Sequence, residues 1–179
     1  MTAQVTLLLP FLQHPTATRS MENLWSPWRY DYVALMGATP KACPFCIDEG
    51  THEDVDRLIV FRGEHNFVIL NLYPYTLGHL LIVPYIHTAK LDELNASQTS
   101  EMMILAQRGI RALRTLYHPE GFNLGMNLGH CAGAGIREHV HMHVVPRWVG
   151  DANFISVVAE TRVLSEELKI TQRRVAEVF

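Results

Sequence analysis

Several features that mark other protein classes are scarce or missing in this sequence of 179 residues. Three cysteines are too few for the disulfide framework of a small secreted protein, and they favour a reducing, cytoplasmic location. No apolar run approaches the roughly 20 residues that a membrane-spanning helix needs. The formal net charge is only −3, so nothing predicts broad electrostatic binding of nucleic acids. We therefore expect neither a membrane nor a nucleic-acid polymer as partner.

Apolar residues make up 48% of the chain, which is enough for a hydrophobic core, and the length suits one domain. We divide the sequence into three parts: an N-terminal extension at 1–20, a domain at 21–150 that begins with an aromatic and cysteine-bearing arm, and a tail at 151–179. The extension is expected to be loosely attached. Because the globular pattern begins at Leu24, Met21 serves as a hypothetical start of the native chain.

Hydrophobic patterning predicts strands and two helices. The strands are expected at 57–62, 66–72, 77–84 and 121–128, with one more in a histidine-rich segment that follows. Asn95 and Gln98 have the spacing of a capping box, and the apolar face after them predicts a helix to about Tyr117. Together these elements predict an α+β domain built on an antiparallel sheet.

The tail is predicted to contain an amphipathic helix from about Leu164 that packs on the domain. Its candidate contacts are Leu168, Val175 and Phe179.

The ten histidines are the unusual feature of the composition, and three of them alternate with apolar residues in one short segment. His139, His141 and His143 have the period of two that is typical of a half-buried strand. On a regular strand the three imidazoles would leave one face, spaced about 6.7 Å apart, while Val140 and its neighbours point into the core. That spacing is too wide for all three rings to bind one metal ion, so it predicts histidines with distinct roles.

Cys43 and Cys46 form a Cys-x-x-Cys pair with the spacing of a zinc knuckle. A buried pair or a redox motif would have the same sequence, although the βαβ context of a thioredoxin-like redox motif is absent. Zinc requires four ligands, so two histidines would have to join the cysteines. His87, which follows a proline-ended strand, and His139 are the candidates by position. We therefore expect structural Zn²⁺.

A glycine-rich loop and three polar residues complete the candidate site. Small residues at 129–135 would let backbone N–H groups approach a phosphate, although many such loops are only turns. Asn71 and Asn127 stand at predicted strand ends, where asparagine is often a turn former. His79 lies in an apolar strand, where it is either a hydrogen-bonded core residue or a site residue that faces His141 or His143.

The His-x-His-x-His segment followed by two valines, with Asn71 and His79 upstream, resembles the histidine-triad superfamily. The resemblance extends from the Cys-x-x-Cys arm to Trp148. It implies a five-stranded antiparallel sheet with one long helix, paired into a homodimer with a continuous sheet.

The resemblance also implies roles for residues of this chain. His141 would be the nucleophile that attacks the α-phosphorus of a nucleotide and carries a nucleotidyl group. His143 and His79 would hold phosphate oxygens and assist the leaving group. Asn71 would bind ribose hydroxyls, and Asn127 with the 133–135 loop would face the phosphates. The remaining implied positions are the base pocket, Phe45, Ile69 and Leu81; the phosphate loop, Gly133, Ala134 and Gly135; and the zinc ligands, Cys43, Cys46, His87 and His139.

The chain departs from many members of the superfamily in one respect. Those members carry a Gly-Gln pair before the histidines, whereas no glutamine lies between Asn127 and His139 here. The small loop residues, the Leu-Trp-Ser-Pro-Trp-Arg arm and the Pro-Arg-Trp extension look more like the diadenosine tetraphosphate phosphorylase or hydrolase branch. Trp148 would then either stack on a second adenine or pack in the core.

We therefore interpret the chain as an enzyme that cleaves dinucleoside polyphosphates, with phosphate or water as acceptor. Three alternatives stay open. The missing glutamine disfavours a nucleoside phosphoramidate hydrolase. A nucleotide-binding signalling module would turn over slowly. A metal-binding β domain would use His141 and His143 as ligands.

Overall fold

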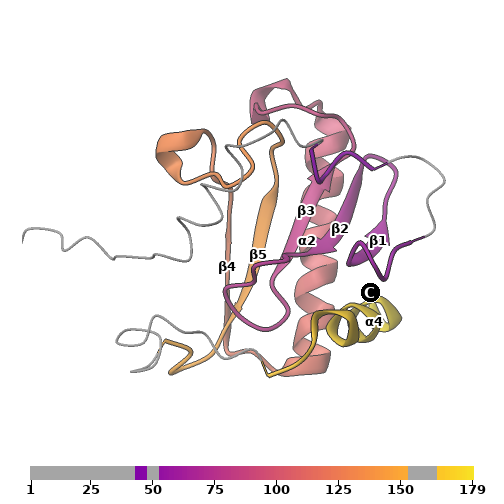
Figure 1. The fold of residues 1–179 in the computed structure, drawn as a ribbon, viewed down its shortest axis with the longest axis vertical. Coiled ribbons are helices and arrows are strands. Elements are labelled where there is room, and N and C mark those ends of the chain that lie inside the picture. The colour runs from indigo at the N-terminus through magenta and orange to yellow at the C-terminus, as the bar shows by residue number, and fades with distance from the viewer. Residues whose placement is uncertain (1–42, 48–52, 153–164) are drawn as a thin grey trace, which may run out of the picture.

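The computed structural model describes residues 43–47, 53–152 and 165–179, and within these ranges five strands form one antiparallel sheet. The strand order is β1-β2-β3-β5-β4, with β5 between β3 and β4 (Figure 1). The strands are β1 Ile59–Arg62, β2 Asn66–Leu70, β3 Leu80–Pro84, β4 Gly121–Gly125 and β5 Met142–Arg147. The helices in the described part of the chain are α2 Ala96–Tyr117, α4 Leu168–Val178 and the short 3-10 helices η1 Leu91–Glu93 and η2 His130–Ala132. The predicted α+β fold with an antiparallel sheet, a long helix and a C-terminal helix is confirmed.

The strands are shorter than predicted, and local turns explain where they begin and end. Leu58 adopts a left-handed conformation with φ 62° just before β1 begins. The Asn71 side chain accepts the backbone N–H of Tyr73, which turns the chain away after β2. Gly78, with φ 75°, delays the start of β3 to Leu80. At one end of β1, β2 and β3, local turns therefore shorten the strand at a position that hydrophobic patterning alone does not mark.

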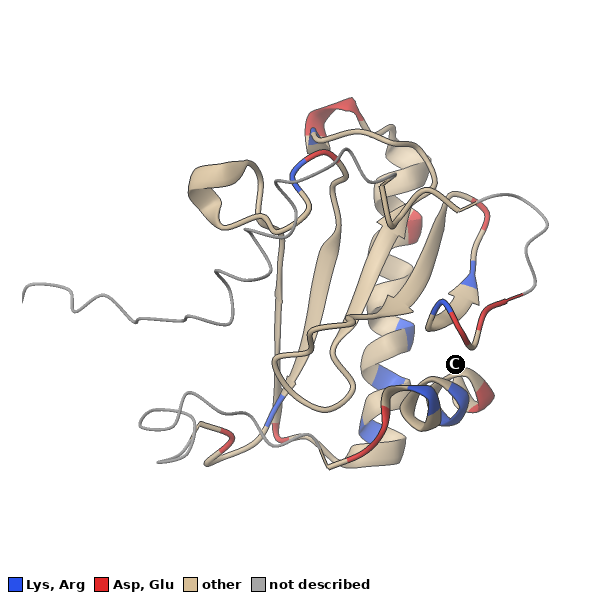
Figure 2. Ribbon diagram, viewed as in Figure 1, with Lys and Arg blue, Asp and Glu red and all other residues tan. Residues whose placement is uncertain are grey.

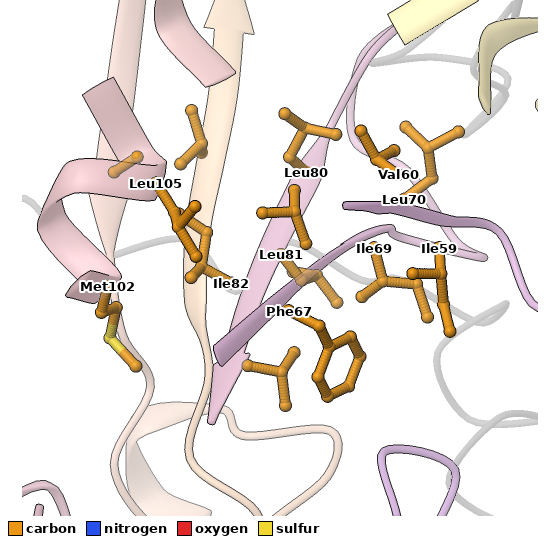
Figure 3. Packing of buried hydrophobic residues seen from close by; sticks show 14 of the residues in the cluster. Ile59, Val60, Phe67, Ile69, Leu70, Leu80, Leu81, Ile82, Met102 and Leu105 are labelled. Atoms are coloured by element: carbon orange, nitrogen blue, oxygen red, sulfur yellow. The ribbon is translucent and has the colours of Figure 1, made fainter. Parts of the chain in front are cut away.

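Helix α2 covers one face of the sheet (Figure 1). The predicted capping box is present: the Asn95 side chain accepts from the Gln98 backbone, and the Gln98 side chain accepts from the Asn95 backbone. The buried side of the helix, which includes Met102 and Leu105, packs near Leu80 and Ile82 of β3 (Figure 3). This core places the even-numbered residues of β3 and β5 on the α2 side. The odd-numbered ones, including His143, therefore lie on the opposite face.

Helix α4 packs against β1 and α2. Val175 is buried, and the Gln172 side chain donates to the carbonyl of Ile59. Figure 2 shows that charged residues gather on α4 and the lower part of α2, whereas the sheet carries few. On the face of the sheet away from α2, β5 presents His143 and, at its end, Arg147.

Within the described ranges, no helix combines the length and the apolar character that a membrane span requires. The predicted extension at 1–20, the aromatic arm near 23–30 and the segment around Leu164 lie outside the described residues.

Candidate active site and metal centre

The histidine segment enters the sheet later than a regular strand would. β5 begins at Met142, so His139 and His141 precede the ladder instead of belonging to it. The backbone N–H of Val140 donates to the carbonyl of Thr88, outside the sheet, at 2.7 Å. The expectation of a regular strand through all three histidines is therefore wrong. The rings of His141 and His143 are only 4.9 Å apart between centroids, closer than strand geometry predicts.

His141 is buried, and its tautomer follows from one hydrogen bond. Its Nδ1 lies 2.8 Å from the carbonyl oxygen of His139. A carbonyl only accepts, so Nδ1 carries the proton and Nε2 keeps a lone pair. Burial lowers the pKa of His141, which favours the neutral ring, although the bond to His139 opposes the shift. The side chain is thus oriented and protonated as a nitrogen nucleophile requires.

His143, His79 and the backbone of Tyr75 form a chain of hydrogen bonds. The Tyr75 N–H donates to Nδ1 of His79 at 3.1 Å, so Nε2 of a neutral His79 carries the proton. That Nε2 lies 3.0 Å from Nδ1 of His143 and donates to it. His143 consequently carries its own proton on Nε2. These hydrogen bonds make Nε2 of His143, a buried atom, a hydrogen-bond donor.

His79 takes its place in this chain from inside the protein. Its side chain has 0% exposure, and Asn71 Nδ2 approaches its Nδ1 at 3.4 Å. The structure combines the two interpretations of His79, because its ring is buried and hydrogen-bonded and also faces His143. The structure does not expose His79 to phosphate oxygens. The Asn71 amide is engaged on both sides, by His79 and by the turn at Tyr73.

Cys43, Cys46, His87 and His139 come together, with one ligand atom of each lying within 4.8 Å of all the others. Cys43 Sγ is 3.4 Å from Nδ1 of His139, and Cys46 Sγ is 3.2 Å from Nδ1 of His87. Nε2 of His139 donates to the Pro84 carbonyl at 2.8 Å, which leaves its Nδ1 as the lone-pair nitrogen facing the cysteines. This donor set and spacing fit one tetrahedral ion.

The rival metal site through His141 and His143 is not formed by the residues that the structure describes. The group with metal-binding spacing found there contains neither of them. Both are instead hydrogen-bonded, to the His139 carbonyl and to His79.

Phe45 connects the cysteine pair to the histidines. Its buried ring makes edge contacts with the rings of His139, at 5.6 Å between centroids, and His141, at 5.0 Å. Ile69 and Leu81 pair across β2 and β3, and Leu81 pairs with His143. All three predicted base-pocket residues therefore lie on the histidine side of the sheet, although each is buried.

The glycine loop contains the short helix η2 and two left-handed glycines. Gly129 has φ 84° and Gly133 φ 85°, conformations that favour glycine. Ala134 is buried and Gly135 is exposed. Asn127, just before the loop, lines a cavity of about 380 Å³ beside His143. The structure thus places Asn127 in the same cavity as His143.

The cavity also contains residues that the sequence did not single out. Tyr75 and Arg147 line it together with His143. The Tyr75 ring lies parallel to that of His143, at 6.0 Å between centroids. Arg147 extends the period of two beyond His143, a signal that could have identified it. Trp148, in contrast, lies at the end of α2, where its indole N–H donates to the Tyr117 carbonyl at 3.3 Å.

Comparisons with known proteins agree with this architecture. A family model described as HIT domain matches residues 52–149. The chain is 40% identical over 164 residues to AP-4-A phosphorylase of Mycobacterium tuberculosis, covering 87% of this chain and 83% of that protein. A Zn-bound histidine triad family protein from Mycobacterium smegmatis has a similar structure, with TM-score 0.56 and 28% identity over 68% of this chain and 82% of that one. Diadenosine triphosphate hydrolase of Plasmodium falciparum shares the fold, with TM-score 0.57 and 16% identity over 82% and 92% of the two chains.

Proposed function

The chain belongs to the HIT domain family, and from this premise we propose that it cleaves dinucleoside polyphosphates through a covalent His141–AMP intermediate. Diadenosine tetraphosphate is the substrate we expect, because the chain is 40% identical to a protein named AP-4-A phosphorylase. The observation that carries the proposal is the lone pair on Nε2 of a buried, neutral His141, placed beside a proton-bearing Nε2 of His143.

The first step uses that lone pair. Nε2 of His141 attacks the α-phosphorus of one adenosine and forms an N–P bond. The bond from that phosphorus to the bridging oxygen breaks, and ATP leaves with the electron pair. The Nε2–H of His143 donates to an oxygen of the phosphate chain, where charge develops. His79 acts through His143 by fixing its tautomer.

The second step returns the nucleophile to its starting state. An oxygen of the acceptor attacks the phosphorus, the N–P bond breaks, and its electron pair returns to Nε2 of His141, with release of the acceptor's proton. Inorganic phosphate as acceptor yields ADP, whereas water yields AMP. We favour phosphate, because no glutamine lies between Asn127 and His139 to position a water molecule and the similar protein is named a phosphorylase.

We further propose that Cys43, Cys46, His87 and His139 hold a structural Zn²⁺. Tetrahedral zinc at 2.0–2.3 Å from its ligands requires ligand atoms about 3.5 Å apart. The sulfur–nitrogen pairs at 3.4 and 3.2 Å are close to that spacing. When bound, the ion would have all four of its coordination positions occupied by protein atoms. It would also hold the Cys43–Cys46 arm in place. His139 would keep its Nε2–H on Pro84.

The test incubates the protein with diadenosine tetraphosphate, with and without inorganic phosphate. We expect ADP and ATP in equal amounts and only with phosphate. AMP formed without phosphate would identify water as the acceptor. Acid quenching should trap one AMP per wild-type chain in an acid-labile bond. His141→Ala should bind nucleotide but form no adduct, and full turnover by this variant would exclude the mechanism.

A further inference from the structure

The cavity beside His143 runs along β5 on the side away from α2. Its volume of about 380 Å³ falls in the range of small-molecule sites. His143, Val145 and Arg147 line it in succession. Same-face strand residues are about 6.7 Å apart, so Arg147 lies roughly 13 Å along the strand from His143. The cavity is long enough for part of a nucleotide.

The cavity leads away from the nucleophile. His141 precedes β5, whereas Arg147 ends it. The ring of His143 lies between His141 and the Arg147 end of the cavity. The loop that carries Tyr75 crosses in front of β5 and β4 (Figure 1), and the Thr76 hydroxyl holds it to the Pro146 carbonyl at 2.8 Å. A phosphate chain with one phosphorus at His141 that passes over His143 would enter this cavity.

The far end of the cavity has a fixed set of donors and acceptors. Arg147 donates to both carboxylate oxygens of Asp151, at 2.5 and 2.9 Å, and to the Asn123 side chain at 2.6 Å. The hydrogen bond from Arg147 holds the pKa of Asp151 down at about 2, so the ion pair persists throughout the working pH range. Because its two charges cancel, this pair suits a base edge or ribose hydroxyls better than a further phosphate.

The walls suit the same kind of ligand. Tyr75, which is 39% exposed, supplies an aromatic wall, while Met126 and Val145 supply apolar surface. Nearer His143, the Asn127 amide lines the cavity where phosphate groups would pass. The order along the cavity is thus the His143 imidazole and an amide, then the apolar surface of Val145, then the neutral ion pair.

We propose that this cavity is a second nucleotide subsite, which binds the leaving nucleoside of a dinucleoside polyphosphate between Tyr75 and the Arg147–Asp151 pair. The inference rests on the proposed function for the position of the reacting phosphorus at His141. It assigns the contact with a second base to Tyr75 and Arg147. Stacking on that base was one of two roles that the sequence left open for Trp148, whose indole lies at the end of α2. The subsite would make the enzyme prefer dinucleotides over mononucleotide esters.

The experiment compares two substrates that share the His141 chemistry and differ in leaving group. Diadenosine tetraphosphate would fill the subsite, whereas adenosine 5′-monophosphate p-nitrophenyl ester would leave it largely empty. Arg147→Ala should raise KM for the dinucleotide about tenfold, the typical effect of losing a hydrogen bond to a charged group, and leave KM for the ester unchanged. Asn123→Ala should act in the same direction with a smaller effect and without removing a charge.

Arg111→Ala is the matched control, because Arg111 is an exposed arginine on α2, on the other side of the sheet. It should change neither KM. If Arg147→Ala and Asn123→Ala raised KM equally for both substrates, the subsite proposal would be overturned. Unchanged KM values for both substrates would overturn it as well. Failure of the wild-type protein to cleave either substrate would refute the proposed function itself, a result separate from these.

Discussion

The Nδ1 atom of His141 lies 2.8 Å from the carbonyl oxygen of His139, so the backbone of a proposed metal ligand orients the proposed nucleophile. The ring of His139 faces Cys43 on one side and donates to Pro84 on the other. Phe45, which lies between the two cysteines in sequence, contacts both imidazoles. A disturbance at the metal centre should therefore reach His141 through one peptide unit and one aromatic ring.

Loss of one thiolate should remove the metal and destabilise the fold. We expect Cys46→Ser to reduce bound zinc from one ion per chain to none. The free energy of unfolding should fall by about 3 kcal/mol, or roughly 10 °C in Tm for a chain of this size. Metal analysis and thermal unfolding measure both effects. Cys131→Ser is the control, because Cys131 is an exposed free thiol outside the metal-binding group. Zinc retained by Cys46→Ser at one ion per chain would contradict the assignment.

Replacement of His79 should slow the chemical step without weakening substrate binding. His79→Phe keeps a buried ring but cannot donate to His143, so His143 loses its fixed tautomer. We expect kcat to fall about 100-fold, the scale of one general acid–base group, with KM nearly unchanged. Nitrogen NMR shifts of His143 should report a mixture of tautomers in the variant. His118→Asn is a matched control, because asparagine tolerates the left-handed helix cap that His118 forms. A large rise in KM with constant kcat would instead indicate direct contact between His79 and substrate.

Local patterns in the sequence were sufficient to predict the fold class. The capping box at Asn95 and Gln98 depends on residues three apart, and burial of Met102 and Leu105 follows from helical spacing. The ends of the strands were less accessible to prediction. The positive φ of Leu58 and the bond from Val140 to Thr88 depend on chain segments that come together only in the folded protein.

The candidate site, like the fold, could be predicted from the sequence only in part. Ligand counting and the family resemblance both selected Cys43, Cys46, His87 and His139, and the structure brings the four together. The burial of His79 could not be read from its apolar neighbours, because it depends on the Tyr75 loop folding back over the sheet. The position of Trp148 likewise depends on the end of α2, a remote segment.

Glu101 should make stability depend on pH. Its carboxylate accepts from the backbone N–H groups of Glu64, His65 and Asn66. Burial would raise the pKa of Glu101, but these bonds and that of the Asn66 side chain outweigh it and lower the pKa below 4.5. A lowered pKa in the folded state stabilises the protein above pH 4.5, and this stabilisation is lost as the pH falls through the folded-state value.

Glu101→Gln should therefore cost about 2 kcal/mol in the free energy of unfolding at pH 7. Urea unfolding across pH 3 to 7 should show the two proteins converging in acid. A difference that is constant over this range would show that the charge of Glu101 is not responsible.

The exposed edge of the sheet should mediate pairing of two chains, as the family resemblance implies. Asn123, Leu124 and Gly125 of β4 are exposed, and among the residues that the structure describes β4 pairs with β5 alone. We expect a homodimer by light scattering and a shift toward monomer in Leu124→Glu, because like charges would face each other across the seam. Met103→Glu, a substitution of an exposed apolar residue on α2, is the comparison. A wild-type monomer at all concentrations would refute the pairing.

Cys43 and His139 are 96 positions apart in the chain, yet their ligand atoms lie 3.4 Å from each other. An ion held between them would close a loop of that size and reduce the freedom of the unfolded chain. During synthesis, the four-ligand centre cannot form until residue 139 has been made and β3 has delivered Pro84 and His87 to it. His141 follows two residues later, so the nucleophile would be set in place only as the last part of the domain folds.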